Sequence, residues 1–296
     1  MGVDSPFSSM QAERSQDHRT RVLLYKRLAR ELGRPVVAIF TSYRYPVMLD
    51  DSDANMLESV LQEIDLASGL CLVMSSPGGS GVAAERIINM CRAYSGTGEY
   101  WAFVPSKAKS AATMLCMGAS KITMGPSSEL GPIDPQWGPT DNNIWLSLAN
   151  VVSTYDQLFE RAVRTDGNIE PYLQQLANYD EREIAEFRAA VLLADDIAAR
   201  ALSTGMMKGT DVGEIRKKID VFCSPDRTMS HGRPIYEAEA ARCGLNIERA
   251  DVASAVWKTA YELQIRLDAY VSTSAAKAIE YARDGYVVGA PPPFDE

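Results

Sequence analysis

Two short motifs that follow apolar, strand-like runs constrain the fold of this 296-residue chain more than any other feature. Residues 70–74 (Leu-Cys-Leu-Val-Met) predict a buried strand, and residues 76–80 (Ser-Pro-Gly-Gly-Ser) follow it as a turn. The glycines leave backbone N–H groups uncovered by side chains, so the turn is suited to binding an anion. A second apolar run, 100–104, precedes residues 109–111 (Lys-Ser-Ala), where a helix of small residues is expected to begin.

Ser110 stands at the expected N-terminus of that helix, where unpaired N–H groups and the helix dipole favour negative charge. A hydroxyl at a helix start and an uncovered glycine turn are the two parts of an acyl-transfer site, a nucleophile and an oxyanion hole. Each motif alone is typical of an ordinary turn or an ordinary helix cap. Their occurrence in this order, with a predicted helix and strand between them, favours the catalytic interpretation.

Strand-like and helix-like segments alternate over the first half of the chain. Strands are expected at 36–41, 70–74, 100–104 and 121–124, and helices at 17–32, 50–64, 82–94 and 111–118. This alternation predicts an α/β fold with a mostly parallel sheet, right-handed crossovers and helices that cover the sheet. Functional residues are then expected beyond the carboxyl ends of the strands, where both motifs lie.

The second half of the chain is expected to be mainly helical. Helices are predicted over most of 142–193, at 234–243 and at 252–282, with an interruption at 165–171 and a loop at 220–227. Residues 1–15 are expected to be mobile, and the tail 290–296 extended. The predicted divisions are an N-terminal amphipathic helix (1–33), an α/β core (34–140), a helical insertion with a histidine-bearing segment (141–250), and a C-terminal helix with a proline-rich tail (251–296).

Composition and charge argue against several classes of function. The chain carries 30 Lys and Arg against 39 Asp and Glu, a formal net charge of −9, which argues against a nucleic-acid partner. Its two histidines and five scattered cysteines argue against a zinc site, and no cofactor is expected. The cysteines are typical of reduced core residues in a cytoplasmic protein. Because the sequence has no apolar run of 18 residues, no integral membrane segment is expected.

Three longer motifs carry a resemblance to a known family. They are residues 76–79 (Ser-Pro-Gly-Gly), 104–113 (Val-Pro-Ser-Lys-Ala-Lys-Ser-Ala-Ala-Thr) and 124–136 (Met-Gly-Pro-Ser-Ser-Glu-Leu-Gly-Pro-Ile-Asp-Pro-Gln). In this order they resemble the serine dehydrogenase proteinase family, distant relatives of the Clp protease and signal peptide peptidase A in the crotonase-like superfamily. The resemblance covers residues 20–140 and one short later segment. Members often carry an N-terminal membrane helix, which we do not expect here.

The resemblance implies a fold and an assembly. The fold is Clp/crotonase-like, with repeated β-β-α or βα units, a mostly parallel sheet and a helical C-terminal region. Members of this fold usually assemble, so we expect a homo-oligomer. The amphipathic helix at 17–32 and the later helices offer apolar surface for such contacts.

The resemblance also implies a Ser-Asp-His triad in that chain order. Ser110 is the expected nucleophile, His231 its general base, and Asp134 the residue that orients the histidine. A serine needs such a base near neutral pH. His231 belongs to residues 230–235 (Ser-His-Gly-Arg-Pro-Ile), which are similar to the later histidine motif of the family. The other histidine, His18, lies among charges and is interpreted as a surface residue.

The related proteases imply that the N–H groups of Gly79 and Ala111 form the oxyanion hole. Gly78 and Ser80 are then expected to contact the substrate. Glycine at position 79 is expected to let the substrate backbone approach closely. The strand end beyond it is expected to accept an extended peptide by β-augmentation.

Several alternatives stay open. Signal peptide peptidases use a Ser-Lys dyad, for which Lys107, Lys109 and Lys121 are the nearby candidates, and Lys109 is expected to point away from the serine. A crotonase-like acyl-CoA enzyme would use the same glycine turn, but normally with catalytic acids at the second motif. A catalytically silent scaffold or peptide-binding module is a further class. The predicted function is an ATP-independent, cytoplasmic serine endopeptidase that acts on peptide or protein substrates through an acyl-enzyme on Ser110.

Overall fold

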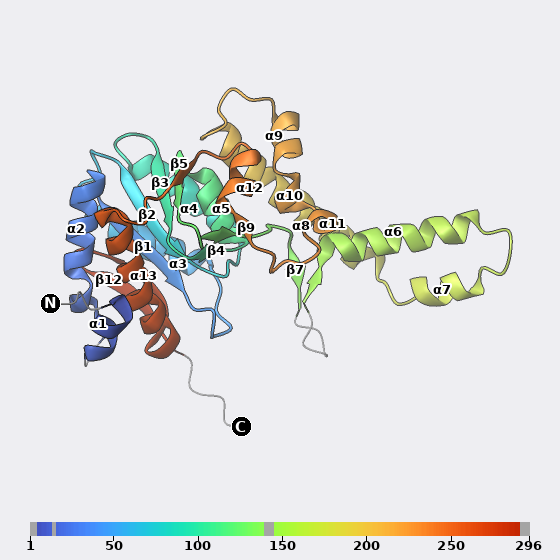
Figure 1. Cartoon of the computed structure of the whole chain (residues 1–296). Coiled ribbons are helices and arrows are strands. Elements are labelled where there is room, and N and C mark those ends of the chain that lie inside the picture. The colour runs from blue at the N-terminus through green and yellow to red at the C-terminus, as the bar shows by residue number, and fades with distance from the viewer. Residues whose placement is uncertain (1–4, 14–15, 139–144, 291–296) are drawn as a thin grey trace.

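The computed structural model describes residues 5–13, 16–138 and 145–290, and its centre is a seven-stranded sheet with helices on both faces (Figure 1). The strand order is β10-β5-β3-β2-β1-β11-β12. In chain order these strands are β1 (Val36–Thr41), β2 (Leu70–Ser75), β3 (Tyr100–Val104), β5 (Lys121–Met124), β10 (Ile247–Arg249), β11 (Ala275–Tyr281) and β12 (Gly285–Gly289).

Parallel pairing dominates this sheet. The five strands from β10 to β1 pair in parallel, whereas β11 is antiparallel to β1 and β12 is antiparallel to β11. Every residue of β1 and β2 is buried, which explains why their sequences read as continuous apolar runs rather than as alternating ones. The predicted fold class, α/β with a mostly parallel sheet, is confirmed.

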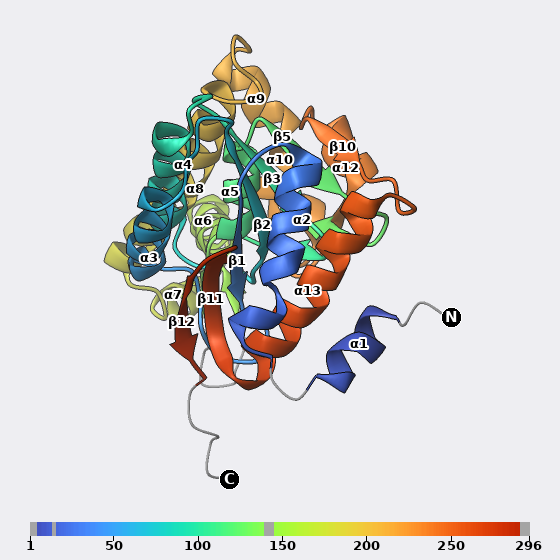
Figure 2. The same ribbon diagram turned by 90° about the vertical axis from the view of Figure 1, so that its left-hand side faces the viewer.

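The two faces of the sheet carry separate helical layers (Figure 2). One layer holds α3 (Asp51–Gln62), α4 (Gly81–Tyr94), α5 (Ala111–Gly118) and α8 (Glu181–Ser203), and the other holds α2 (Val22–Leu32) and α13 (Ala255–Thr273). Side chains of β1 alternate between the two cores: Val37 packs in the first and Phe40 in the second. Helix α2 ends before Gly33, whose φ of +69° lies in the left-handed region.

A helical arm, which we define as residues 148–193, projects from the body (Figure 1). It consists of α6 (Leu148–Arg164), α7 (Glu170–Leu176) and the first part of α8. The helical character predicted for this region is confirmed over the arm. The predicted interruption at 165–171 is shorter, since α7 begins at Glu170, and a second break at 177–180 was not predicted. The predicted helix start at 142 lies outside the described residues. Among the residues that the structure describes, no helix is both long enough and apolar enough to cross a membrane.

The expectation that residues 1–15 are mobile is wrong for part of that segment. Residues Pro6–Ala12 form helix α1, which contacts α13. Ser5 caps this helix by accepting a hydrogen bond from the Ser8 N–H, and Pro6 occupies the first helical position. A short 3-10 turn, His18–Thr20, precedes α2.

The prediction of one long helix at 252–282 is also wrong, because α13 ends at Thr273 and the chain continues as strand β11. The sequence of β11 favours a helix by propensity, but the strand fills the place beside β1. Its charged side chains are buried and paired: Lys277 with Asp50 and Asp53, and Glu280 with Arg21. Tertiary pairing therefore overrides local propensity here.

Smaller corrections concern the segment before β11. The loop predicted at 220–227 contains two short helices, and the helix predicted at 234–243 begins as a strand. The elements are α9 (Val212–Lys218), α10 (Asp220–Cys223), α11 (Pro225–Thr228), β9 (Ile235–Tyr236) and α12 (Glu237–Arg242). Gly244 follows this segment with a φ of +83°, in the left-handed region. The expected extended tail falls largely on residues 291–296, outside the described residues.

A buried ion pair fastens α2 to the sheet. Arg21 donates two hydrogen bonds to Glu280, from Nε at 2.6 Å and from Nη2 at 2.8 Å, and Tyr25 donates a third at 2.9 Å. The arginine and glutamate side chains are 0% and 1% exposed. Because both charges are desolvated, removing one partner leaves the other without compensation.

We expect Arg21→Ala to lower the free energy of unfolding by about 3–5 kcal/mol, because Glu280 stays buried without its cation. Urea denaturation monitored by circular dichroism measures this loss. The matched control is Arg19→Ala, which breaks the exposed Arg19–Asp17 pair. Its free energy of unfolding is expected to equal that of the wild type. Equal urea midpoints for both variants would contradict the stated role of the buried pair.

Candidate active site

A small three-stranded sheet gathers the three predicted triad residues. Its order is β4-β6-β9, with β4 (Lys107–Ala108) parallel and β9 antiparallel to β6 (Glu129–Leu130). Ser110 follows β4, Asp134 follows β6, and His231 precedes the antiparallel β9. The C-terminal ends of β4 and β6 and the N-terminal end of β9 therefore lie at the same end of this sheet. The sequence analysis did not predict this sheet, because its strands are only two residues long.

Ser110 occupies a strained turn at the start of α5. Its φ of +51° and ψ of −122° lie outside the helical region, and Met229 is the other described non-glycine residue with positive φ. The Ser110 side chain is half-buried, and its hydroxyl makes no hydrogen bond to any residue that the structure describes. All residues of α5 are buried, so the helix holds the turn rigidly in the core.

The glycine turn packs directly on Ser110. Ser76 pairs with Ala108 in an isolated parallel bridge, in which the Lys109 N–H donates to the Ser76 carbonyl at 3.0 Å. A Cβ on Gly78 would lie 2.6 Å from both the Lys109 carbonyl oxygen and the Ser110 Cβ. Only glycine fits at this point of contact, where φ is +102°. The predicted neighbourhood of the two motifs is thus present in the structure.

Gly79 is constrained by Leu49, which the sequence analysis did not single out. The Leu49 N–H donates to the Gly78 carbonyl, and the Ser80 N–H donates to the Leu49 carbonyl, both at 2.8 Å. A Cβ on Gly79 would lie 2.2 Å from the Leu49 carbonyl oxygen. We predicted that glycine here gives room to a substrate backbone, but the side-chain position is occupied by the Leu49 backbone of the same chain.

Two backbone donors are left unpaired beside Ser110. The Gly79 N–H has no acceptor within the described part of the chain, and the Ala111 N–H opens helix α5 without one. By contrast, the Gly78 N–H donates to the Ser76 hydroxyl at 3.1 Å. Ser80, predicted to contact substrate, caps α4, where its hydroxyl accepts from the Ala83 N–H at 3.2 Å.

Asp134 and His231 are in contact although 97 residues separate them. The His231 Nδ1 lies 2.7 Å from the Asp134 Oδ1, and the two side chains are 28% and 3% exposed. The loop of Asp134 is anchored by its neighbour, since the Ile133 N–H donates to the Phe222 carbonyl at 2.7 Å. A carboxylate at Nδ1 leaves Nε2 of the ring to act as a base.

Gln136 also contacts Asp134, and the sequence analysis did not assign it a role. Its Nε2 donates to the second carboxylate oxygen, Oδ2, at 2.6 Å. Gln136 belongs to the short hairpin of β7 (Gln136–Trp137) and β8 (Leu146–Ser147). The sequence held one indication of this contact. Gln136 comes two residues after Asp134, with Pro135 between them, and a side chain at that spacing can bend back to hydrogen-bond the carboxylate.

Ser110 and His231 do not form a hydrogen bond in this structure. Of the two contacts that a triad needs, the one between Asp134 and His231 is therefore present and the one between His231 and Ser110 is not. The ring nitrogen Nε2 of His231 has no partner among the described residues. Catalytic hydrogen bonds in substrate-free enzymes are often long and tighten only when the substrate binds.

The candidate lysines are engaged elsewhere. Lys109 Nζ lies 3.3 Å from Glu129 Oε1 and donates to the Leu130 carbonyl at 3.2 Å, so the side chain lies against β6. Burial lowers the pKa of the Lys109 ammonium, and the neighbouring Glu129 opposes this shift. Lys107 Nζ lies 4.1 Å from the centre of the Tyr43 ring, and Lys121 pairs with Glu248 at 2.7 Å.

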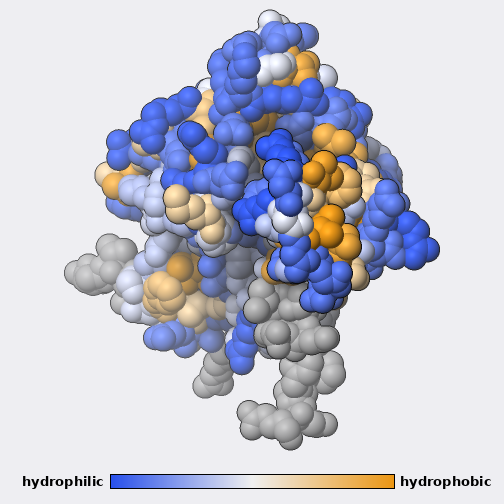
Figure 3. Space-filling model, turned by 90° about the vertical axis from the view of Figure 1, so that its right-hand side faces the viewer, coloured by the Kyte–Doolittle hydropathy of each residue, from blue (hydrophilic) through white to orange (hydrophobic). Residues whose placement is uncertain are grey.

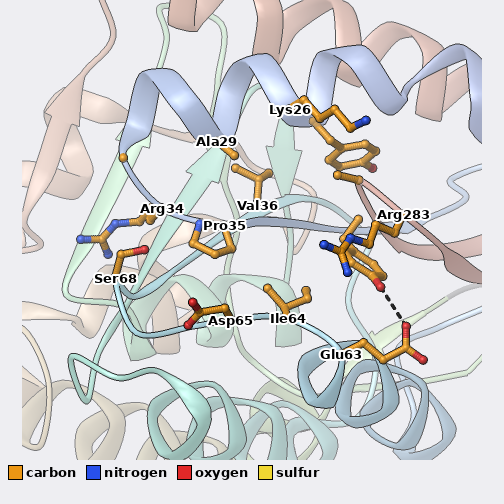
Figure 4. Close-up of a pocket in the computed structure, with 14 residues that line it drawn as sticks. Lys26, Ala29, Arg34, Pro35, Val36, Glu63, Ile64, Asp65, Ser68 and Arg283 are labelled. Atoms are coloured by element: carbon orange, nitrogen blue, oxygen red, sulfur yellow. Dashed lines mark hydrogen bonds between the residues drawn. The ribbon is translucent and has the colours of Figure 1, made fainter.

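A cavity of about 650 Å³ lies away from this site, at the start of β1 (Figure 4). It contains none of the predicted site residues. Three cations and two acids line it, namely Lys26, Arg34, Arg283, Glu63 and Asp65. Figure 4 shows Arg34 at one end and Arg283 at the other, with Glu63 bonded to a tyrosine hydroxyl. This mixture of charges does not single out one class of ligand.

Comparisons with known proteins concern the fold alone. No protein-family model matches the chain, and no curated protein matches it by sequence. Among solved structures, the chain is similar to the 1510-N membrane-bound stomatin-specific protease. A serine-to-alanine mutant of that protein is 15% identical over 46% of this chain and 66% of its own, with a TM-score of 0.32. A lysine-to-alanine mutant in complex with a substrate peptide is 14% identical over 78% of this chain and 96% of its own, with the same TM-score. At this degree of similarity no residue role is transferred to this chain.

The contact between Gly78 and the Ser110 turn yields a stability prediction. We expect Gly78→Ala to lower the free energy of unfolding by about 2–4 kcal/mol, because overpacking adds to the strain of a positive φ. The matched control is Gly98→Ala, where φ is +71° but nothing lies within 4 Å of the new Cβ. The control should lose about 1–2 kcal/mol from backbone strain alone. Indistinguishable urea midpoints would show that the two motifs are not in tight contact.

Proposed function

We propose that this protein is a serine peptidase that forms an acyl-enzyme on Ser110. His231 acts as general base and then as general acid, and Asp134 orients the histidine. The observation that carries the proposal is the 2.7 Å contact between Asp134 and His231, at the edge of the small sheet where the strained Ser110 turn also lies.

The chemistry follows from the charges that develop during acyl transfer. His231 Nε2 accepts the proton of the Ser110 hydroxyl as its oxygen attacks the scissile carbonyl carbon. The unpaired N–H groups of Gly79 and Ala111 are oriented by Leu49 and by helix α5, and they receive the resulting oxyanion. His231 then returns the proton to the leaving amine, and water hydrolyses the ester. Endopeptidase action on peptide or protein substrates without ATP, in the cytoplasm, is part of this proposal.

A Ser-Lys dyad is the second candidate mechanism. It is favoured by the burial of Lys109, which lowers the pKa of its ammonium and so eases its use as a base. Against it, Lys109 would have to leave Glu129 and the Leu130 carbonyl to reach Ser110. A catalytically silent, peptide-binding module remains the alternative without chemistry.

Labelling with a fluorophosphonate probe, followed by mass-spectrometric site mapping, tests the mechanism. We expect the probe to modify Ser110 in the wild type and not in Ser110→Ala. His231→Ala should slow the modification by at least about 1000-fold, because the serine loses its base. Lys109→Ala should label at a rate within a few-fold of the wild type, and it serves as the matched control.

Other outcomes separate the alternatives. Loss of labelling in Lys109→Ala with retention in His231→Ala would establish the dyad in place of the triad. A folded wild type that never reacts, and that cleaves no peptide, would favour the silent module. Labelling at another serine would overturn the assignment of Ser110.

We propose further that the protein is a homo-oligomer and that the helical arm takes part in the contacts. Large apolar side chains are exposed along the arm. The most exposed include Phe159, Val163, Leu173, Leu192 and Leu193. Figure 3, which faces the end of the arm, shows hydrophobic residues gathered among hydrophilic ones. Surfaces of this kind commonly mark protein contacts.

The double substitution Val163→Glu and Leu192→Glu is expected to reduce the mass in solution to that of a monomer, because it places charges on the apolar arm. Light scattering coupled to size-exclusion chromatography measures the mass. Both side chains are about 70% exposed, so the fold should tolerate the change. Val252→Glu, on the body, is the control and should leave the mass unaltered. A wild type that is monomeric at all concentrations would refute the assembly.

A further inference from the structure

We propose that Gln136 is a positioning residue, which holds the Asp134 carboxylate in the orientation that His231 requires; this inference rests on the proposed function. The two oxygens of Asp134 have separate partners. Oδ1 lies 2.7 Å from His231 Nδ1, and Oδ2 accepts from Gln136 Nε2 at 2.6 Å. The carboxylate is therefore held at both oxygens and cannot rotate without breaking a hydrogen bond.

The burial of Asp134 makes this second hydrogen bond important. The side chain is 3% exposed, so solvent does not compensate a missing partner. Within the described ranges, no donor other than Gln136 reaches Oδ2. An ionised carboxylate depends on such donors, since a hydrogen bond to the charged form favours that form. Removing the Gln136 amide would leave a buried, charged oxygen unpaired.

Gln136 is itself fixed by its surroundings. Its backbone pairs with Ser147 across the β7–β8 hairpin, and Pro135 restricts the chain between it and Asp134. The Leu148 N–H, at the start of the helical arm, donates to the Pro135 carbonyl at 3.0 Å. These contacts hold the backbone from which the glutamine amide reaches Asp134. A donor is needed here, which explains an amide rather than a carboxylate at this position.

The decisive variant is Gln136→Glu, which keeps the size of the side chain but makes its donor depend on pH. When the new carboxyl group is protonated, it can donate to Asp134 as the amide does. When it is ionised, two carboxylates face each other, and such pairs raise the pKa of one member. We expect the labelling rate of Ser110, relative to the wild type, to fall as the pH rises through that pKa.

Gln136→Ala removes the donor at every pH. We expect a labelling rate about 10- to 100-fold below that of the wild type, because a hydrogen bond to a charged group is lost. The matched controls are Gln174→Ala and Gln174→Glu on the arm. Gln174 also donates to a carboxylate, Glu170, at 3.4 Å, but on an exposed helix. Both controls should label at the wild-type rate throughout the pH range.

A second readout does not depend on activity. The chain has only two histidines, so in a His18→Gln background the nuclear magnetic resonance signals of the imidazole ring report on His231 alone. We expect Gln136→Ala to shift the Nδ1 resonance, because the carboxylate that lies 2.7 Å from Nδ1 loses its second partner and is free to rotate. Gln174→Ala should leave this resonance where it is.

The outcomes separate the inference from the proposed function. If the wild type is never labelled, the proposed function fails, and the His231 Nδ1 resonance alone decides on Gln136: a moved resonance supports its positioning role and an unmoved one overturns it. If the wild type is labelled, equal rates for Gln136→Ala and the wild type overturn the inference. Equal, pH-independent losses in Gln136→Ala and Gln136→Glu would point to a merely structural role and would also overturn it.

Discussion

The close contact between Gly78 and the Ser110 turn is the constraint on which the site depends. Backbone meets backbone there without an intervening side chain, so the ends of two neighbouring strand-turn units reach contact distance. The approach places the glycine turn, with the unpaired N–H of Gly79, next to the start of α5, where the N–H of Ala111 is unpaired. It also requires the strained φ of Ser110, which the fully buried helix α5 maintains. The packing of the surrounding core, rather than the turn itself, holds Ser110 in this unfavourable backbone conformation.

The acid side of the site is organised by burial and not by strain. Asp134 is nearly inaccessible to solvent, so its charge depends on the partners that the fold supplies. His231 comes from the segment before β9, and Gln136 comes from the hairpin that leads into the helical arm. The start of the arm therefore lies one hydrogen bond away from the loop of Asp134, through Leu148 and Pro135. The helical arm and the loop of Asp134 are thus connected through a short stretch of backbone.

The sequence predicted secondary structure correctly wherever that structure depends on residues within the same element. The apolar runs of β1 and β2 and the end of helix α2 at Leu32 were predicted correctly, because burial and helix termination act within a few residues. Residues 275–281 were misread, since Lys277 and Glu280 look exposed until Asp53 and Arg21 are brought to them from distant segments. Gln136 and Leu49 escaped notice for the same reason, because their roles consist entirely of contacts with other segments.

The amino-acid sequence by itself determined the α/β class, the glycine turn after one strand, and the serine at a helix start after another. These follow from periodicity, from the conformational freedom of glycine and from the free N–H groups of a helix terminus, which are local properties. Only the tertiary structure decided that Asp134 meets His231, that Lys109 turns to Glu129, and that Leu49 fills the space beside Gly79. Each of these contacts joins residues from different elements, and the path of the chain around the small sheet sets which of them meet.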